Sequence, residues 1–109
     1  MKIKVSEATP KQIDWMVAKC EDVLFPRSVP KYSTDWAQGG PIIEREDIAT
    51  EPATMLGQCA AFAWDATIYA ADSDAWSTYG PTPLIAAMRC YVVSKLGEEV
   101  EIPDELMEG

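Results

Sequence analysis

The sequence contains no histidine and no long apolar run. Without histidine, the chain lacks the usual general base, the usual zinc ligand and every Ser-His or Cys-His nucleophile, so the common hydrolases are disfavoured. Cys20, Cys59 and Cys90 are odd in number and lack CxxC spacing, which predicts reduced thiols that pack in the interior. No apolar stretch approaches the roughly 18 residues that span a bilayer, and the opening MKIKVSEATP lacks the apolar core of a signal peptide. We therefore expect a cytoplasmic protein.

Basic residues are scarce as well. Nine lysines and arginines stand against 18 acidic residues, which gives a net charge of −9. A field of that sign repels nucleic acid phosphates and anionic membrane surfaces, so we expect neither as a partner. The most acidic segment is the end of the chain, residues 98–109 (EEVEIPDELMEG), for which we expect a solvated terminus.

Length and composition predict one globular domain over residues 1–109. Apolar residues make up 48% of the chain and charged residues 25%, the profile of a folded protein. A chain of 109 residues can bury one modest core but not two. The patterns described below indicate an α+β fold, in which a short antiparallel sheet packs against two main helices.

The first helix is predicted from about Pro10 to Glu21. Thr9 can cap its N-terminus, Pro10 suits the first helical position, and Gln12 completes a capping box. The helix has an apolar stripe at core-facing spacing, made of Ile13, Met16, Val17 and Cys20.

A second helix is predicted within GPTPLIAAMRCYVVSKLG. Thr82 can cap it, Pro83 takes the first position, and Gly97 lies beyond its end. Apolar residues cover a broad arc of this helix and small residues cover another, which predicts burial over much of its circumference.

The clearest strand is AFAWDATIYAA. Its alternation predicts that one set of side chains faces the core, namely Phe62, Trp64, Ala66 and Ile68, and that the other set faces outward, namely Asp65, Thr67 and Tyr69. A turn around Asp72 to Asp74 leads to AWSTY, which can pair with the first strand as an antiparallel hairpin.

The segment YSTDWAQGGPIIERED, residues 32–47, combines turn and helix signals. We expect Ser33 or Thr34 to cap a short turn through Trp36 that ends at Gly39, and Pro41 to start another turn ending near Glu46. A strand follows from Ile48, and Pro52 keeps it short or at a sheet edge.

Arg89 is unusual because it projects within the apolar arc of the second helix, where an unpaired charge costs several kcal/mol. Two interpretations are open. In the first, Arg89 has a structural role: it forms an ion pair, with Glu44 or Glu46 as candidates, or its aliphatic stem packs while its guanidinium reaches water. In the second, Arg89 binds an anion in a pocket, because arginine holds phosphate or carboxylate through a planar fork.

Trp15 points away from the apolar stripe of the first helix, with Lys11 and Lys19 one turn away. One interpretation is that the indole stacks on a ring of a ligand while the lysines meet its phosphates. The other is that Trp15 packs under a loop or against a second subunit.

Two blocks of sequence, WAQGGPIIERED and GPTPLIAAMRCYVVSKLG, together with the opening MKIKVSE and the ending EVEIPDEL, resemble the NinX-like family of small lambdoid phage proteins. The resemblance covers the N-terminal helix, the Trp-Gly-Gly-Pro segment and everything from Gly80 onward. Residues 50–78 are less similar, and Asp47 stands where we expect a glycine. The resemblance implies a dispensable phage accessory protein in the cytoplasm of the infected bacterium, and it brings no known catalytic residues and no cofactor.

The first functional hypothesis is a non-enzymatic binder that sequesters a nucleotide-derived signal of the host's antiviral defence. Aromatic faces can stack on a base, scarce cations can bind phosphates, and glycines expose backbone N–H groups to an anion. The candidate ligand-binding residues are Trp15, Trp36, Gly39, Gly40, Arg45 and Arg89.

Two alternatives remain from other classes. An acidic protein inhibitor or adaptor would use the net charge of −9 to dock on a basic surface of a host or phage enzyme. An enzyme would hold a divalent metal through Asp35, Glu44 and Glu46, although no phosphate-binding loop with lysine is present. We also expect a homo-oligomer, because Trp15 lies off the core stripe and the last helix is heavily apolar in so short a chain.

Overall fold

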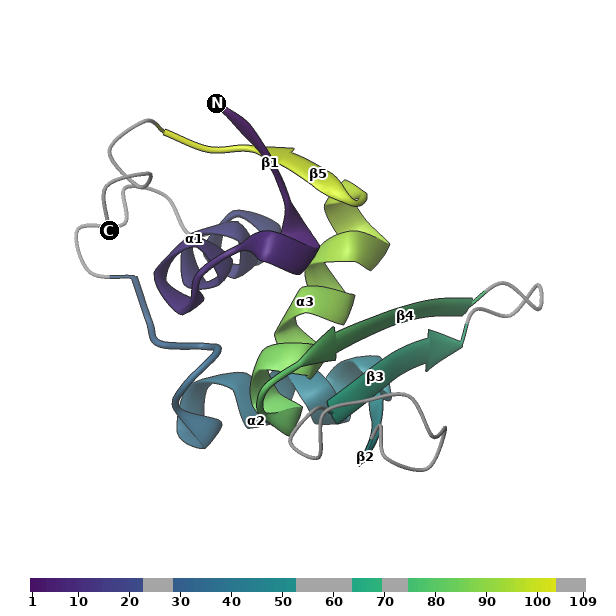
Figure 1. The fold of residues 1–109 in the computed structure, drawn as a ribbon. Coiled ribbons are helices and arrows are strands. Elements are labelled where there is room, and N and C mark those ends of the chain that lie inside the picture. Colours follow the sequence, from purple (N-terminus) through teal and green to yellow (C-terminus); the bar gives the residue numbers. More distant parts are fainter. Residues whose placement is uncertain (23–28, 53–63, 70–74, 104–109) are drawn as a thin grey trace.

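The protein is described here by a computed structural model that defines residues 1–22, 29–52, 64–69 and 75–103. These residues form an α+β domain, as predicted, with two antiparallel sheets (Figure 1). The elements in chain order are β1 (Lys2–Lys4), the 3₁₀ helix η1 (Val5–Glu7), α1 (Pro10–Cys20), α2 (Trp36–Glu46), β2 (Ala49–Pro52), β3 (Trp64–Tyr69), β4 (Ala75–Gly80), α3 (Pro83–Leu96) and β5 (Glu99–Glu101).

Helix α3 is the centre of the fold. It packs against β3 and β4 on one side and against α1 and α2 elsewhere on its surface (Figure 1). The predicted signals are confirmed, since the Thr82 side chain accepts a hydrogen bond from the Ile85 N–H at 3.1 Å and Gly97 follows the last turn with φ 90°. Most of its side chains are buried. Among the helices of the described residues, none is long and apolar enough to cross a membrane.

Helix α1 also follows the sequence prediction. Thr9 and Gln12 form the capping box, with hydrogen bonds of 3.3 and 2.9 Å between side chain and backbone. Ile13, Met16 and Val17 are fully buried against the core. Burial of this stripe joins α1 to α3.

The prediction of two short turns around Gly39 and Pro41 is wrong. Residues Trp36–Glu46 form one continuous helix, α2, whose N-cap is Asp35; its carboxylate accepts from the Ala37 N–H at 3.0 Å. Pro41 lies inside α2, where its missing N–H leaves the carbonyl four residues earlier, on Ala37, without a helix bond. Ala37 is exposed, so water can satisfy that carbonyl.

Tertiary packing explains why Gly39 does not end the helix. A Cβ at this position would lie 2.3 Å from the Tyr32 carbonyl oxygen and 2.7 Å from Leu84 Cδ1. Glycine is therefore required where α2 lies against the preceding segment and α3. Gly40 is different, because the nearest atom to its Cβ position is in the Trp36 ring, 3.9 Å away.

A left-handed residue ends α2 and leads into the second sheet. Asp47 has φ 52° and ψ 48°, the conformation usually taken by glycine after a helix. The following strand β2 is an edge strand of the order β2-β3-β4, as Pro52 predicted. It pairs antiparallel with β3.

The predicted hairpin is confirmed, with β3 and β4 antiparallel and Ala66 opposite Thr78. Ala66 is fully buried and the Thr78 hydroxyl donates to the Ala86 carbonyl at 2.8 Å, so this face lies on α3. Asp65 was expected to be exposed but is only 7% exposed, on the opposite face of the sheet. Tyr79 lies directly across from Asp65 and is a large neighbour on that face. Phe62 and the turn at 72–74 lie outside the described residues.

The expectation of a solvated terminus from Glu98 onward is also wrong for the part that the structure describes. Residues Glu99–Glu101 form β5, which pairs antiparallel with β1 (Figure 1). Val100 and Ile102 are 3% and 2% exposed, because alternate strand residues share one face. Residues 104–109 lie outside the described residues.

Candidate functional site: a cleft beside Arg89

Arg89 lies on α3 and is half-buried. Its Nη1 donates to the Tyr79 carbonyl at 2.8 Å and its Nη2 to the Ala8 carbonyl at 3.0 Å, so it joins β4 to the segment before α1. Its Nε is buried without a hydrogen-bond partner. Burial lowers the pKa of the guanidinium. The guanidinium is therefore fixed in position by neutral carbonyl groups.

The predicted ion pair of Arg89 with Glu44 or Glu46 is not formed. Glu46 is paired with Arg45 at 2.9 Å and with Lys95 at 3.6 Å. Among the described residues, no carboxylate lies within ion-pair distance of Arg89. A guanidinium has five N–H donors, so the second N–H of Nη1 and of Nη2 still lacks an acceptor in that part of the chain.

Arg89 lines a cleft of about 660 Å³. One wall is β4 and the residues after it, and the other wall comes from β1, η1 and the start of β5 (Figure 1 locates these elements). The polar and charged lining residues that bear on its chemistry are Lys4, Ser6, Ser77, Arg89, Glu98 and Glu99. The cleft therefore combines residues from both ends and the middle of the chain.

The free edge of β4 contributes backbone groups to this cleft. The Tyr79 carbonyl accepts from Arg89, so it points away from β3. Both backbone groups of a residue in an antiparallel pair point to the same side, and the direction alternates along the strand. The N–H groups of Ser77 and Tyr79 therefore point away from β3, toward the cleft that both residues line. Ser77 is opposite Thr67 on β3, and their hydroxyls lie 3.1 Å apart. Such a short distance is typical of opposed residues whose backbones do not hydrogen-bond to each other, which agrees with this direction of the Ser77 N–H.

The charges of the cleft balance. Lys4 and Arg89 supply two positive charges, and Glu98 and Glu99 supply two negative charges. Lys4 is opposite Glu99 in the β1–β5 register, yet none of these four side chains forms an ion pair among the described residues. The described lining of the cleft is therefore locally neutral in a chain of net charge −9.

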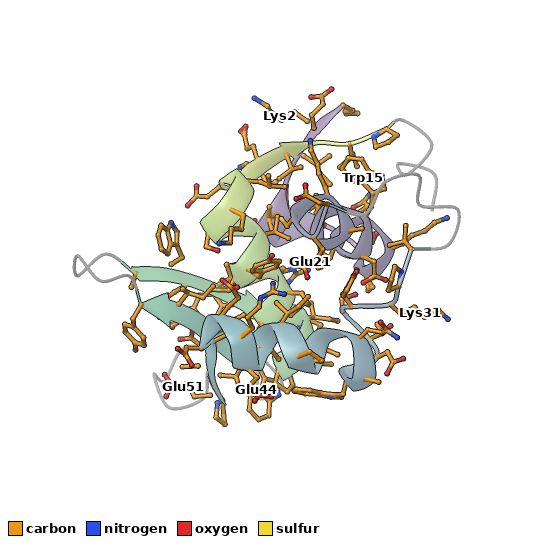
Figure 2. The ribbon with its side chains drawn as sticks, turned by 180° about the vertical axis from the view of Figure 1, so that it is seen from behind. Lys2, Trp15, Glu21, Lys31, Glu44 and Glu51 are labelled. Carbon is orange, nitrogen blue, oxygen red and sulfur yellow. The ribbon has the colours of Figure 1, made fainter. Side chains whose placement is uncertain are left out.

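Arg45 lies elsewhere and most of its donors are occupied. Its Nη1 and Nη2 donate to Glu21 at 3.0 and 2.7 Å, its Nε donates to Glu46, and Nη2 also reaches the Tyr91 hydroxyl. Figure 2 shows Glu21 between α1 and α2. Tyr91 and Arg89 are two positions apart on α3, so they project about 200° from each other. The structure does not bring Arg45 and Arg89 together.

The Glu21 cluster has the electrostatics of a structural contact. Hydrogen bonds from Arg45 lower the pKa of Glu21 and raise that of Arg45. Tyr91 donates its hydroxyl to Glu21, and burial raises the pKa of the phenol above its ordinary value. These contacts join the end of α1 to α2 and α3 and occupy four of the five N–H donors of Arg45.

The predicted glycine and tryptophan positions are not part of the cleft. The Gly39 N–H donates to the Asp35 carbonyl at 3.0 Å within α2, so it is not exposed to an anion. Trp36 is 54% exposed on α2 and Gly40 lies beside its ring. Trp15 is half-buried against the core, with Lys19 Nζ 5.6 Å from its ring centroid. Neither tryptophan is among the residues that line the cleft.

The three carboxylates that were candidates for binding a metal do not lie together. Asp35 caps the N-terminus of α2, whereas Glu44 and Glu46 belong to its last turn, so about 13 Å or more of helix separates Asp35 from either glutamate. No group of three or more metal-ligating side chains occurs in the described ranges. Cys20 and Cys90 are free thiols, as expected, and burial raises the pKa of each to about 11, which keeps them protonated. Cys59 lies outside the described residues.

Sequence reasoning found Arg89 from its place in an apolar arc, but it missed Lys4, Ser77, Glu98 and Glu99. Lys4 and Glu99 enter the cleft through the pairing of β1 with β5, which joins residues far apart in sequence. The signal available was the alternation in EVEI, which places two apolar residues on one face of an extended chain.

Comparison with known proteins decides the family. A family model described as Bacteriophage P22, NinX matches residues 30–95, which is more than half of the 109 residues. The chain belongs to the NinX family. The matched residues contain α2, the β2-β3-β4 sheet and all of α3 except Leu96. They therefore include Arg89 and the β4 wall of the cleft. Lys4, Glu98 and Glu99 lie outside it. No curated protein matches the chain.

Membership of the NinX family makes this a phage accessory protein. The resemblance noted in the sequence is confirmed for the Trp-Gly-Gly-Pro segment and for the helix that contains Arg89. The match also includes residues 50–78, which looked less similar, and it does not include α1.

Proposed function

We propose that this phage protein is a non-enzymatic binder of a nucleotide-derived signalling molecule, which it sequesters in the host cytoplasm to counter antiviral defence. The observation that carries the proposal is Arg89, a half-buried guanidinium that is held by two backbone carbonyls, faces a cleft and has no carboxylate partner among the described residues. A phosphate group would supply the acceptors that its remaining N–H donors lack.

The surroundings of Arg89 fit a small anionic ligand. A cleft of about 660 Å³ lies within the range of ordinary small-molecule sites. Lys4 adds a second positive charge, and the outward N–H groups of Ser77 and Tyr79 add neutral donors. Tyr79 is among the lining residues and its side chain is exposed, so its ring is available as an aromatic face for a base.

The net charge supports a small ligand over nucleic acid. A chain of net charge −9 repels a long polyanion, whereas a locally neutral cleft with two cations can admit a single nucleotide. Sequestration without turnover is proposed because the chain has no histidine to serve as a general base.

The test is to incubate the purified protein with ADP-ribose-type molecules and cyclic nucleotides, remove unbound ligand, heat-denature the protein and identify what is released. Intact ligand supports sequestration. A chemically altered product would show an enzyme instead. Neither binding nor turnover, together with co-purification of a host protein, would favour the acidic inhibitor that the sequence left as an alternative.

Matched variants locate the site. Arg89→Ala removes the proposed phosphate-binding group, and Lys31→Ala removes one positive charge from an exposed position that does not line the cleft (Figure 2). We expect the first variant to release little or no ligand and the second to release as much as the unmodified protein. Equal loss in both would mean that only overall charge matters, and would contradict a site at Arg89.

A further inference from the structure

The two carboxylates of the cleft limit what the ligand can be. Glu98 and Glu99 line the same cleft as Arg89 and Lys4, and among the described residues neither forms an ion pair. An ionised carboxylate accepts hydrogen bonds but donates none. A ligand made only of phosphates would satisfy Arg89 but would meet like charge at Glu98 and Glu99.

A ligand with hydroxyl donors at a distance from its phosphates satisfies both sets of residues. The two adjacent hydroxyls of a ribose can donate to carboxylates, and dinucleotide-binding proteins use an acidic residue in this way. Such hydrogen bonds to a charged acceptor are the stronger kind. The phosphates would then lie toward Arg89 and the sugar toward β5.

On the basis of the proposed function, we infer that the ligand carries a ribose with free vicinal hydroxyls as well as phosphate, and that Glu98 and Glu99 accept hydrogen bonds from those hydroxyls. This class includes ADP-ribose and its relatives. It excludes 3′,5′-cyclic dinucleotides as preferred ligands, because one hydroxyl of each ribose is esterified. The carboxylates would thus select the ligand, while Arg89 provides affinity for phosphate.

The test is isothermal titration calorimetry of the full chain with four probes: ADP-ribose, ADP, 2′,3′-dideoxy-ADP and cyclic di-AMP. We expect ADP-ribose and ADP to bind, and dideoxy-ADP to bind roughly tenfold or more weakly than ADP, since it lacks the hydrogen bonds to a charged acceptor. Cyclic di-AMP should bind more weakly than ADP-ribose.

Variants assign the discrimination to the carboxylates. The double variant Glu98→Ala/Glu99→Ala should bind ADP and dideoxy-ADP equally, with affinity for dideoxy-ADP unchanged or improved by the loss of like charge. Glu101→Ala is the control, because it removes a carboxylate from the same strand outside the cleft and should keep the preference for ADP. Thermal unfolding of each variant confirms that it folds.

The outcomes separate the two proposals. If none of the four probes binds, the proposed function itself fails and this inference falls with it. If dideoxy-ADP or cyclic di-AMP binds as tightly as ADP-ribose, and the double variant changes nothing, nucleotide binding stands and the role of the hydroxyls is overturned.

Discussion

Arg89 on α3 donates a hydrogen bond of 2.8 Å to the backbone carbonyl of Tyr79 on β4. This contact joins the central helix to the free edge of the sheet and fixes the guanidinium at the cleft. Because the acceptor is a neutral carbonyl, the positive charge of Arg89 is not cancelled. The same contact therefore serves packing and leaves a cation available to an anionic ligand.

The two adjacent glycines of α2 are predicted to respond in opposite ways to alanine. Gly39→Ala should lower the free energy of unfolding by about 1–3 kcal/mol, because the new Cβ would meet the Tyr32 carbonyl oxygen and the Leu84 side chain. Gly40→Ala should raise it by up to about 1 kcal/mol, because its Cβ has room and alanine favours a helix. Urea unfolding measures both, and equal effects of the two substitutions would contradict the packing described for Gly39.

Asp47 is predicted to be a strained position at the end of α2. With φ at 52°, glycine should be better tolerated and alanine worse, since the left-handed region costs an ordinary residue about 1–2 kcal/mol. Asp47→Gly should therefore be neutral or stabilising by about 0.5 kcal/mol, while Asp47→Ala should destabilise by about 1 kcal/mol. Thermal unfolding that ranks alanine above glycine would show that this turn is not left-handed in solution.

Acid is predicted to weaken the contact between Glu21 and Arg45. The pKa of Glu21 is lowered by hydrogen bonds from Arg45 relative to its ordinary value of 4.5, so folding favours the ionised form. Its stabilising contribution is present above about pH 4.5 and is lost as pH falls through the lowered pKa. The difference in unfolding free energy between the unmodified protein and Glu21→Gln should shrink from roughly 1 kcal/mol at pH 7 toward zero as pH falls below the lowered pKa of Glu21.

The comparison with Glu21→Gln is needed because another carboxyl changes in the opposite sense. Burial raises the pKa of Asp14, which accepts hydrogen bonds from the Ser33 N–H and hydroxyl at 2.8 and 2.6 Å. Its raised pKa makes folding more favourable as pH falls, which would mask the change at Glu21 in the unmodified protein alone. A difference that stays constant from pH 7 down to the acid unfolding of the protein would contradict the ion pair.

Homo-oligomerisation remains a prediction, but the structure gives a different reason for expecting it. Trp15 packs against the core and α3 is covered within one chain, so neither needs a second subunit. Among the exposed large apolar side chains, Trp36, 54% accessible on α2, is the one that we expect to make a contact. If Trp36 lies in a subunit interface, Trp36→Lys should convert an oligomer to a monomer in light scattering at micromolar concentration. A monomer before substitution would end the prediction.

Local chemistry made much of the fold predictable. Thr9 and Gln12 marked the start of α1, and Thr82 and Gly97 marked both ends of α3, because caps depend on residues a few positions apart. Gly39 was misjudged because the groups that require it, the Tyr32 carbonyl and Leu84, come from other segments. The contribution of a glycine to tertiary packing cannot be read from its neighbours in sequence.

The candidate site was predictable only in part for the same reason. Arg89 was noticed because a charge within an apolar arc needs an explanation that the helix alone does not give. Glu98 and Glu99 were assigned to a solvated terminus, because their partner strand β1 is at the other end of the chain. Arg45 was proposed as a phosphate-binding residue, but Glu21, from another helix, already occupies it.

The most direct test of the central claim is ligand-induced thermal stabilisation of Arg89→Ala and of the unmodified protein in saturating ADP-ribose. The account predicts a clear increase in melting temperature for the unmodified protein and little or none for Arg89→Ala, with both folded in the absence of ligand. Stabilisation of Arg89→Ala that equals that of the unmodified protein would contradict the assignment of Arg89 as the group that binds phosphate.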